Sequence, residues 1–338
     1  MPTPQMLNRV EFETPGPEMC VRCGREFTTT DSLETTDFCS FQCEHLWAEE
    51  HGEHAIRKHG RFPRIGYIDG ELFTFLVKPL SLLERVQHYP IDIFTFLGHP
   101  SATRCTYNYP CDPETLAVVQ LTTFDHWWKK QAQYSVRKQV NKAERAGVRL
   151  QEETLTEELL TAVHEIYNET PIRQGRRFPY YGCSIERVRQ MTSTFPNRSI
   201  FLTARWNGRI IGFIKLVTQD EDYATVLHIL SLVAHRDKSP TNALLAFAVR
   251  ICCDRHISML SYGRFNYGKK GHDGLQEFKI THGFECLTIP RYYVPLTIRG
   301  RIALRLGLHH PLRERIPGSI ARTFLDVRSK WYAAVVQR

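Results

Sequence analysis

Four cysteines near the amino terminus have the spacing of a metal site. Cys20 and Cys23 are separated by two residues, and Cys39 and Cys43 form a second pair after fifteen intervening residues. Paired thiolates of this kind bind zinc tetrahedrally, and Gly24 allows the tight turn that follows the first pair. Because four thiolates leave no coordination position open for water, the sequence predicts a structural zinc ion.

The cysteine pattern resembles small treble-clef or zinc-ribbon modules over residues 18–50, and we expect this module to occupy residues 1–60. The amino terminus lacks a basic and apolar secretory signal, and no run of about 18 apolar residues follows. We therefore expect a cytoplasmic protein. A reducing compartment disfavours disulfides, which strengthens the interpretation of the clustered thiols as metal ligands.

A predicted basic helix is a second candidate for chemistry. Apolar residues recur at helical spacing from Trp127, and Gly147 follows the last of them as a helix cap would. The remaining faces carry mainly lysine and arginine, among them Arg137 and Lys138. This cationic stripe is either a solvated face or an anion-binding face.

The elements that would position these groups follow from residue 154 onward. A capping box at Thr154 to Glu157 predicts a helix that ends before Pro171, and Asn207-Gly208 predicts a tight hairpin within a three-stranded meander over 199–233. Ser239-Pro240 predicts the start of another helix, followed by a strand, a helix ending at Gly283, and a last strand. The order predicts an α+β domain with one mixed sheet and flanking helices.

Three segments carry motifs that a known family shares: 207–212 (NGRIIG), 278–285 (FKITHGFE) and 137–148 (RKQVNKAERAGV). The first two are similar to a hairpin and to the closing helix-to-strand signature of the GNAT (N-acetyltransferase) fold. The third resembles a helix of its Fem-like branch, which includes the aminoacyltransferases of peptidoglycan bridges. The resemblance covers residues 120–295, and we expect an acyltransferase domain at 61–295 and a basic helical tail at 296–338.

The resemblance implies an N-acyltransferase that moves an acyl or aminoacyl group from an activated donor to an amine of a small molecule or peptide. GNAT enzymes bind the coenzyme A pyrophosphate on a glycine-rich loop, whereas the matching stretch here, 236–241 (RDKSPT), has no glycine. This departure weakens acyl-CoA as the donor and favours an aminoacyl-tRNA. Arg236, Lys238 and the following helix amino terminus remain candidates for binding a phosphate.

Direct transfer to an amine needs a base, a stabiliser for the tetrahedral oxyanion and a proton source for the leaving group. The Phe-Lys pair of the Fem-like branch matches Phe278 and Lys279, so the resemblance implies that Lys279 is the oxyanion stabiliser. His228 is either the base or a core histidine. Tyrosines are candidate proton donors, and further cations could hold an anionic part of a substrate: Tyr262, Tyr267, Arg264, Lys269 and Lys270.

Charge is concentrated at the carboxyl terminus, where residues 291–338 hold ten of the arginines and lysines against two acidic residues. Apolar residues alternate with these cations and a Trp-Tyr pair follows, which predicts either an amphipathic segment on an anionic membrane or a segment packed on the domain. The alternative to an enzyme is a zinc-dependent nucleic-acid-binding or membrane-peripheral protein with a non-catalytic GNAT-like fold. The chain lacks a recognition-helix motif, which disfavours nucleic-acid binding.

Overall fold

A computed structural model of the 338-residue chain describes residues 56–73, 75, 79–101, 105–219, 222–266 and 274–310, with the backbone of two short strands, β1 (Glu18–Met19) and β2 (Glu26–Phe27). The four predicted zinc ligands lie outside the described residues, as do Tyr267, Lys269, Lys270 and the tail beyond residue 310. No helix in the described part of the chain is long and apolar enough to cross a membrane.

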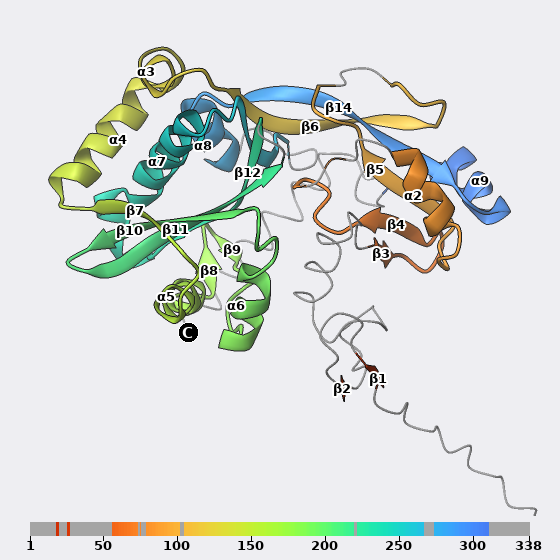
Figure 1. Ribbon diagram of the computed structural model, residues 1–338, viewed down its shortest axis with the longest axis horizontal. Helices are drawn as coiled ribbons and strands as arrows, with labels where there is room; N and C mark the ends of the chain where they lie inside the picture. Colours follow the sequence, from red (N-terminus) through yellow and green to blue (C-terminus); the bar gives the residue numbers. More distant parts are fainter. Residues whose placement is uncertain are drawn as a thin grey trace, which may run out of the picture.

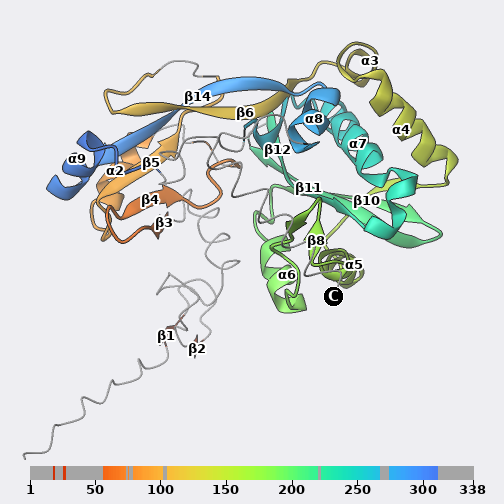
Figure 2. The same ribbon diagram turned by 180° about the vertical axis from the view of Figure 1, so that it is seen from behind.

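The fold is built around a mixed sheet of ten described strands (Figures 1 and 2). Their order in the sheet is β3-β4-β5-β14-β6-β13-β12-β11-β10-β7. β6 (Cys111–Gln120) and β14 (Glu285–Pro295) are long and pair with each other in antiparallel fashion. They join the strands β3, β4 and β5 on one side to the strands β13, β12, β11, β10 and β7 on the other. The predicted mixed α+β architecture is therefore confirmed. The sheet extends further toward the amino terminus than the sequence pattern alone indicated.

One end of the sheet is built from early residues and from the chain after β14. Its strands are β3 (Ile56–His59), β4 (Ile65–Ile68) and β5 (Ile93–Leu97), and its helices are α2 (Pro79–Val86) and α9 (Ile298–Arg305). β5 is buried along its whole length, as expected for a strand with neighbours on both edges. In the predicted tail, α9 buries Gly300 and Ala303 and exposes Ile298 and Ile302.

The other end contains the predicted meander: β10 (Ser199–Trp206), β11 (Arg209–Gln219) and β12 (Tyr223–Ser231), with β7 (Arg149–Glu153) at the edge and β13 (Met259–Arg264) inside. Asn207 and Gly208 both have positive φ, 49° and 79°, as a type I′ hairpin requires. The hairpin is therefore confirmed. Buried side chains of the meander and of its flanking helices form one hydrophobic core.

Helices cover both faces of this end (Figure 1). α4 (Tyr134–Arg145) and α7 (Pro240–Asp254) pack together on one face, and α5 (Glu157–Asn168) and α6 (Ile185–Thr192) pack together on the other. α8 (Gly274–Thr281) precedes β14. Shorter elements complete the order: β8 (Ile172–Arg173), β9 (Arg176–Arg177), α3 (Phe124–His126), the π-helix η1 (Trp127–Gln131) and the 3-10 helix η2 (Val233–Lys238).

The predicted helix from Trp127 to Gly147 is interrupted at Ala132, whose backbone is extended with φ −70° and ψ 130°. Arg137 donates from its Nη1 to the carbonyl oxygens of Trp128 and Ala132, at 2.9 and 2.6 Å, which satisfies acceptors at the break. The break allows the fully buried Trp127 to donate from Nε1 to the His282 oxygen. Tertiary docking therefore overrides the helical periodicity here.

Two further local predictions need correction. The amino cap of α5 is Thr156, whose hydroxyl accepts from the Leu159 N–H, and not Thr154. Cys105 and Cys111 form a disulfide, although a reducing compartment led us to expect none. Composition could not show that the chain returns Cys105 to the first residue of β6.

Candidate functional site

The parallel strands β12 and β13 diverge along their length. Their register joins Tyr223 with Met259, Ala224 with Leu260 and Thr225 with Ser261, and this described ladder ends there. β12 continues to Ser231 beside β11 on its other edge. Beyond Thr225, the edge of β12 that faces β13 has no further pairing with that strand among the described residues.

A cavity of about 600 Å³ lies at the end of this divergence. β12 contributes Ile229 to Ser231, β13 contributes Tyr262, and α8 contributes Leu275 and Phe278. Gln139 of α4, the first turn of α7 and the β8–β9 hairpin complete the wall. Elements from both faces of the sheet therefore meet at one opening.

Every charged residue among the described residues that line the cavity is an arginine: Arg173, Arg176, Arg177 and Arg236. Arg173 is held by the fold, because it donates to the Ser231 oxygen at 2.9 Å and pairs with Glu169 at 3.2 Å. Burial lowers the pKa of Arg173, Glu169 opposes that effect, and repulsion from Arg236 lowers it further. The repulsion shows that the two guanidinium groups share one electrostatic environment, which an anion would stabilise.

The first turn of α7 adds backbone donors to this cationic wall. Glu169 accepts from the Val233 and Ala234 N–H groups at 2.6 and 2.8 Å, which orders the connection that leads into the helix. Pro240, Thr241 and Asn242 of the helix then line the cavity. A helix amino terminus attracts anions through its unpaired N–H groups and its dipole, so it reinforces the arginines.

Ser239 replaces the glycine that the family pattern led us to look for at this turn. Its backbone is left-handed, with φ 54° and ψ 40°, so the tight conformation forms without glycine. Its hydroxyl donates to Gln139 Oε1 at 2.6 Å and does not cap α7. Ser239 is the residue before the first turn of α7, which begins at Pro240 as predicted, but its side chain makes no capping hydrogen bond.

Lys279 lies behind the cavity wall and is fully buried. Its ammonium group donates to the Arg264 oxygen at 2.7 Å and lies 4.7 Å from the centre of the Tyr262 ring. Tyr262 and the half-buried Phe278 are the neighbours that face the cavity. The structure thus brings together three predicted site residues, Phe278, Lys279 and Tyr262. Tyr262 and Phe278 line the cavity, and Lys279 lies behind them.

His228 packs against aromatic rings and is not among the residues that line the cavity. Its ring lies 5.9 Å from that of Tyr180 and 6.3 Å from that of Tyr167. Burial, helped by the nearby Lys215 ammonium, lowers the pKa of His228 to about 4. A histidine that is so weakly basic is poorly matched to taking a proton from an ammonium group, which favours the core interpretation.

Of the other predicted binding residues that the structure describes, Arg236 lines the cavity and the rest do not. Lys238 lies over the Trp206 ring at 4.5 Å, and Arg264 pairs with Glu114 at 3.2 Å. Arg137 is engaged with the break before α4, and Lys138 is exposed on that helix. Neither residue of this predicted cationic stripe lines the cavity; Gln139 is the residue of α4 that does.

The sequence analysis assigned no function to the segment 173–177 (RQGRR), and so missed three of the four cavity arginines. Gln174 and Gly175 have positive φ, 51° and 71°, and form a tight turn between β8 and β9. Three arginines around a turn-forming pair were the available signal. Only the fold shows that this hairpin faces α7.

The fold of the chain is similar to that of solved structures, although comparisons of its sequence find no matching family or curated protein. FemX aligns with a TM-score of 0.52 at 10% identity, covering 74% of this chain and 85% of that one. The chain has a GNAT-like fold. The C-terminal domain of a putative lysylphosphatidylglycerol synthetase from Agrobacterium fabrum aligns with a TM-score of 0.50 at 13% identity, over 79% and 90% of the two chains.

L-PGS from Bacillus licheniformis is a third similar structure, with a TM-score of 0.50 at 14% identity over 74% of this chain and 85% of that one. No protein-family model matches the chain, and no curated protein matches it by sequence. At such low identity the similarity establishes the fold. The chemistry must be argued from the cavity.

Proposed function

We propose that this protein is an N-acyltransferase whose cavity binds the anionic part of an activated acyl donor. The observation that carries the proposal is the cavity itself, which opens where β12 and β13 diverge and whose charged described lining residues are all arginine. The α7 amino terminus adds a second anion-attracting feature to the same wall. Similarity of the fold to FemX supports the reaction class by analogy.

The reaction joins an amine to the donor's acyl carbon. The amine nitrogen attacks the carbonyl, the new C–N bond forms, and the bond from that carbon to the sulfur or oxygen of the donor breaks. Tyr262, at the cavity wall, gives a proton to the departing group, and the amine loses one to a base. Lys279 stabilises the oxyanion through the field of its buried ammonium group beside Tyr262.

Two donors share the phosphate chemistry that this wall would recognise. An acyl-CoA presents a pyrophosphate, and an aminoacyl-tRNA presents a phosphodiester next to its reactive ester. The left-handed Ser239 removes part of the case against coenzyme A, because the turn forms without glycine. The similarity to FemX and the Phe278-Lys279 pair keep aminoacyl-tRNA as the preferred donor.

Binding measurements with the full chain distinguish the donors. We expect either acetyl-CoA or aminoacylated tRNA to bind at physiological salt, and Arg236→Ala to weaken that binding about 10-fold or more, as expected for a lost charge-assisted hydrogen bond. Arg149→Ala is the matched control, because Arg149 is exposed on the edge strand β7 away from the cavity. Equal affinities for wild type and Arg236→Ala, or no binding of either donor, would exclude the proposed donor site.

Acyl transfer itself is tested by incubating the bound donor with mixtures of small amines and amino-terminal peptides and detecting the mass of the new amide. We expect product with the wild-type chain. Structural zinc in the amino-terminal module and contact of the basic tail with an anionic membrane remain proposals that rest on the sequence.

A further inference from the structure

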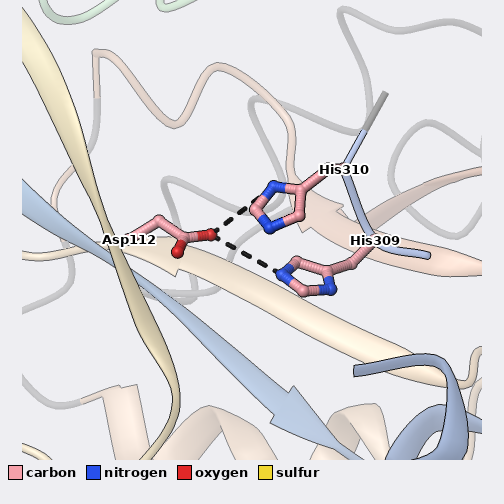
Figure 3. Close-up of side chains that lie close together, drawn as sticks. All are labelled: Asp112, His309 and His310. Atoms are coloured by element: carbon pink, nitrogen blue, oxygen red, sulfur yellow. Dashed lines mark ion pairs between the residues drawn. The ribbon is translucent and has the colours of Figure 1, made fainter. Parts of the chain in front are cut away.

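Three potential metal ligands lie close together where β6 begins beside β14 (Figure 3). The His309 Nε2 and His310 Nδ1 atoms lie 3.6 and 3.8 Å from Asp112 Oδ2. All three ligand atoms lie within 4.8 Å of one another. Asp112 comes from the start of β6, and the histidines follow α9.

The end of α9 determines where the histidines lie. The Gly307 N–H donates to the Leu304 oxygen and the Leu308 N–H donates to the Ala303 oxygen, which is the hydrogen-bond pattern of a Schellman cap. Gly307 has φ +64°, which a side chain would strain. Leu308 packs beside Ala303, and the chain therefore turns back so that the next two residues reach β6.

The helix that carries this turn is itself firmly docked. The Thr297 hydroxyl caps α9 and donates to Asp92 Oδ1 at 3.0 Å. A Cβ on Gly300 would lie 2.0 Å from the backbone carbonyl oxygen of Asp92. The helix therefore lies closer to the sheet than a residue with a side chain at position 300 would allow. The Tyr293 ring packs on His309 at 4.6 Å. The histidines are thus held in place by the fold rather than placed on a loose end.

The carboxylate oxygen that both imidazoles face has no hydrogen bond within the described part of the chain. The Asp112 Oδ2 atom is closed to solvent, and no described residue donates a hydrogen bond to it. Its two imidazole neighbours lie beyond hydrogen-bond distance.

A metal ion satisfies all three groups at once. Ligands at about 2.0–2.1 Å from a tetrahedral zinc ion lie about 3.3–3.4 Å from one another. The two imidazole-to-carboxylate separations, 3.6 and 3.8 Å, need to close by a few tenths of an ångström, and the two imidazole nitrogens, which lie within 4.8 Å of each other, must also move together. Two imidazoles and a carboxylate form a donor set that suits zinc and similar divalent transition ions.

We propose that Asp112, His309 and His310 bind a divalent transition-metal ion of the zinc type. The ion would fasten the turn after α9 to β6. The His309 side chain is 9% exposed, and those of Asp112 and His310 are 37% and 36% exposed, so the cluster lies near the surface although its carboxylate oxygen is covered. The site is separate from the donor cavity and from the predicted tetrathiolate site, since it uses none of their residues.

Zinc stoichiometry in the full chain, produced without a polyhistidine tag, tests the proposal. Protein is stripped with a chelator, reloaded with zinc and desalted, and its zinc content is measured. We expect His310→Ala and His309→Ala each to hold one equivalent less than wild type, because loss of a direct ligand should weaken binding by more than about 100-fold. A difference is measured, so any zinc on the amino-terminal cysteines contributes equally to each sample.

Matched variants keep the result interpretable. His126→Ala removes an exposed histidine on α3 and should retain the wild-type zinc content. Asp112→Asn should lose the same equivalent as the histidine variants. His310 is partly exposed, so His310→Ala tests the site even if His309→Ala is unstable.

Cobalt substitution provides an independent measurement. Cobalt on nitrogen and oxygen ligands shows ligand-field absorption without the thiolate charge-transfer bands of a cysteine site. We expect His310→Ala to lose a thiolate-free component from the spectrum. Equal zinc content in wild type and in the three site variants, with unchanged cobalt spectra, would show that the cluster is an ion-pair cluster only and would overturn the proposal.

Discussion

The two ends of the sheet handle charge in opposite ways. At the end formed by β5, β14 and β6, the buried Arg291 pairs with Glu71 at 2.6 Å and with Glu114 at 3.2 Å. At the cavity end, Arg177 and Arg236 line the wall without a hydrogen bond or ion pair to any described side chain. Charges that the fold satisfies internally hold elements together, whereas cations left at a cavity are available for a ligand. The comparison predicts that mutations at the first end cost stability and mutations at the second end cost binding or turnover.

The largest effect is expected from breaking the internally satisfied end. Arg291→Ala leaves Glu71 and Glu114 without their buried partner, and we expect a loss of about 3–5 kcal/mol in the free energy of unfolding, measured with urea. Arg255→Ala is the control, because it removes an exposed pair with Glu152 that should contribute less than about 1 kcal/mol. Similar losses in the two variants would contradict the contrast between buried and exposed charge.

Lys279 tests the cavity end, since it is a buried cation beside the proposed reaction centre. Lys279→Met keeps most of the side-chain volume and removes the charge, so we expect kcat to fall on the order of 10²-fold or more. Lys138→Met, on an exposed residue of α4, should leave kcat unchanged. If Lys279→Met lowers the free energy of unfolding but keeps the wild-type kcat, the role of this lysine is structural and not catalytic.

Two histidines, the partly buried His228 and the fully buried His282, predict how stability depends on pH. Burial lowers the pKa of both His228 and His282 to about 4. The unfolded chain protonates these groups near pH 6.5, so the stability they permit is present above that value and is lost as pH falls toward 4. Linkage gives a loss of about 1 kcal/mol per histidine between pH 6.5 and 5.5.

Urea titrations across this pH range measure the effect. The two histidines together contribute part of the loss of stability at low pH. His228→Gln should remove about half of that part. The pH profile of kcat/KM should show no inflection from His228 above pH 5. An inflection near neutral pH that disappears in His228→Gln would restore this histidine as the catalytic base.

The smallest effect is expected at Ser239, where the backbone is left-handed. Ser239→Ala keeps the strained conformation and loses the hydrogen bond to Gln139, which should cost about 1 kcal/mol in the free energy of unfolding. Ser239→Gly loses the same bond but relieves the strain of about 1–2 kcal/mol, so its stability should stay near that of wild type. Equal destabilisation by both variants would mean that the turn carries little strain.

Local sequence signals predicted the cavity end well. Asn207-Gly208 marks the hairpin, Gly147 and Gly283 mark helix ends with φ +80° and +83°, and Pro240 marks the start of α7. Each of these depends on backbone conformations that few residue types allow, so a short stretch of sequence is sufficient. The strands β3, β4 and β5 at the other end of the sheet are harder to predict from sequence, because they are short and carry no diagnostic turn.

The amino-acid sequence by itself determined the order of the main elements after residue 154, the hairpin turn at Asn207-Gly208 and the helix ends at Gly147 and Gly283, because these depend on neighbouring residues. Tertiary structure alone decided that β12 and β13 diverge, that the 173–177 hairpin faces α7, and that Lys279 lies behind Tyr262. It also brought Asp112 to the two histidines after α9. These sites join residues that are distant in the chain, and their distances depend on how whole elements pack against one another, which no local pattern encodes.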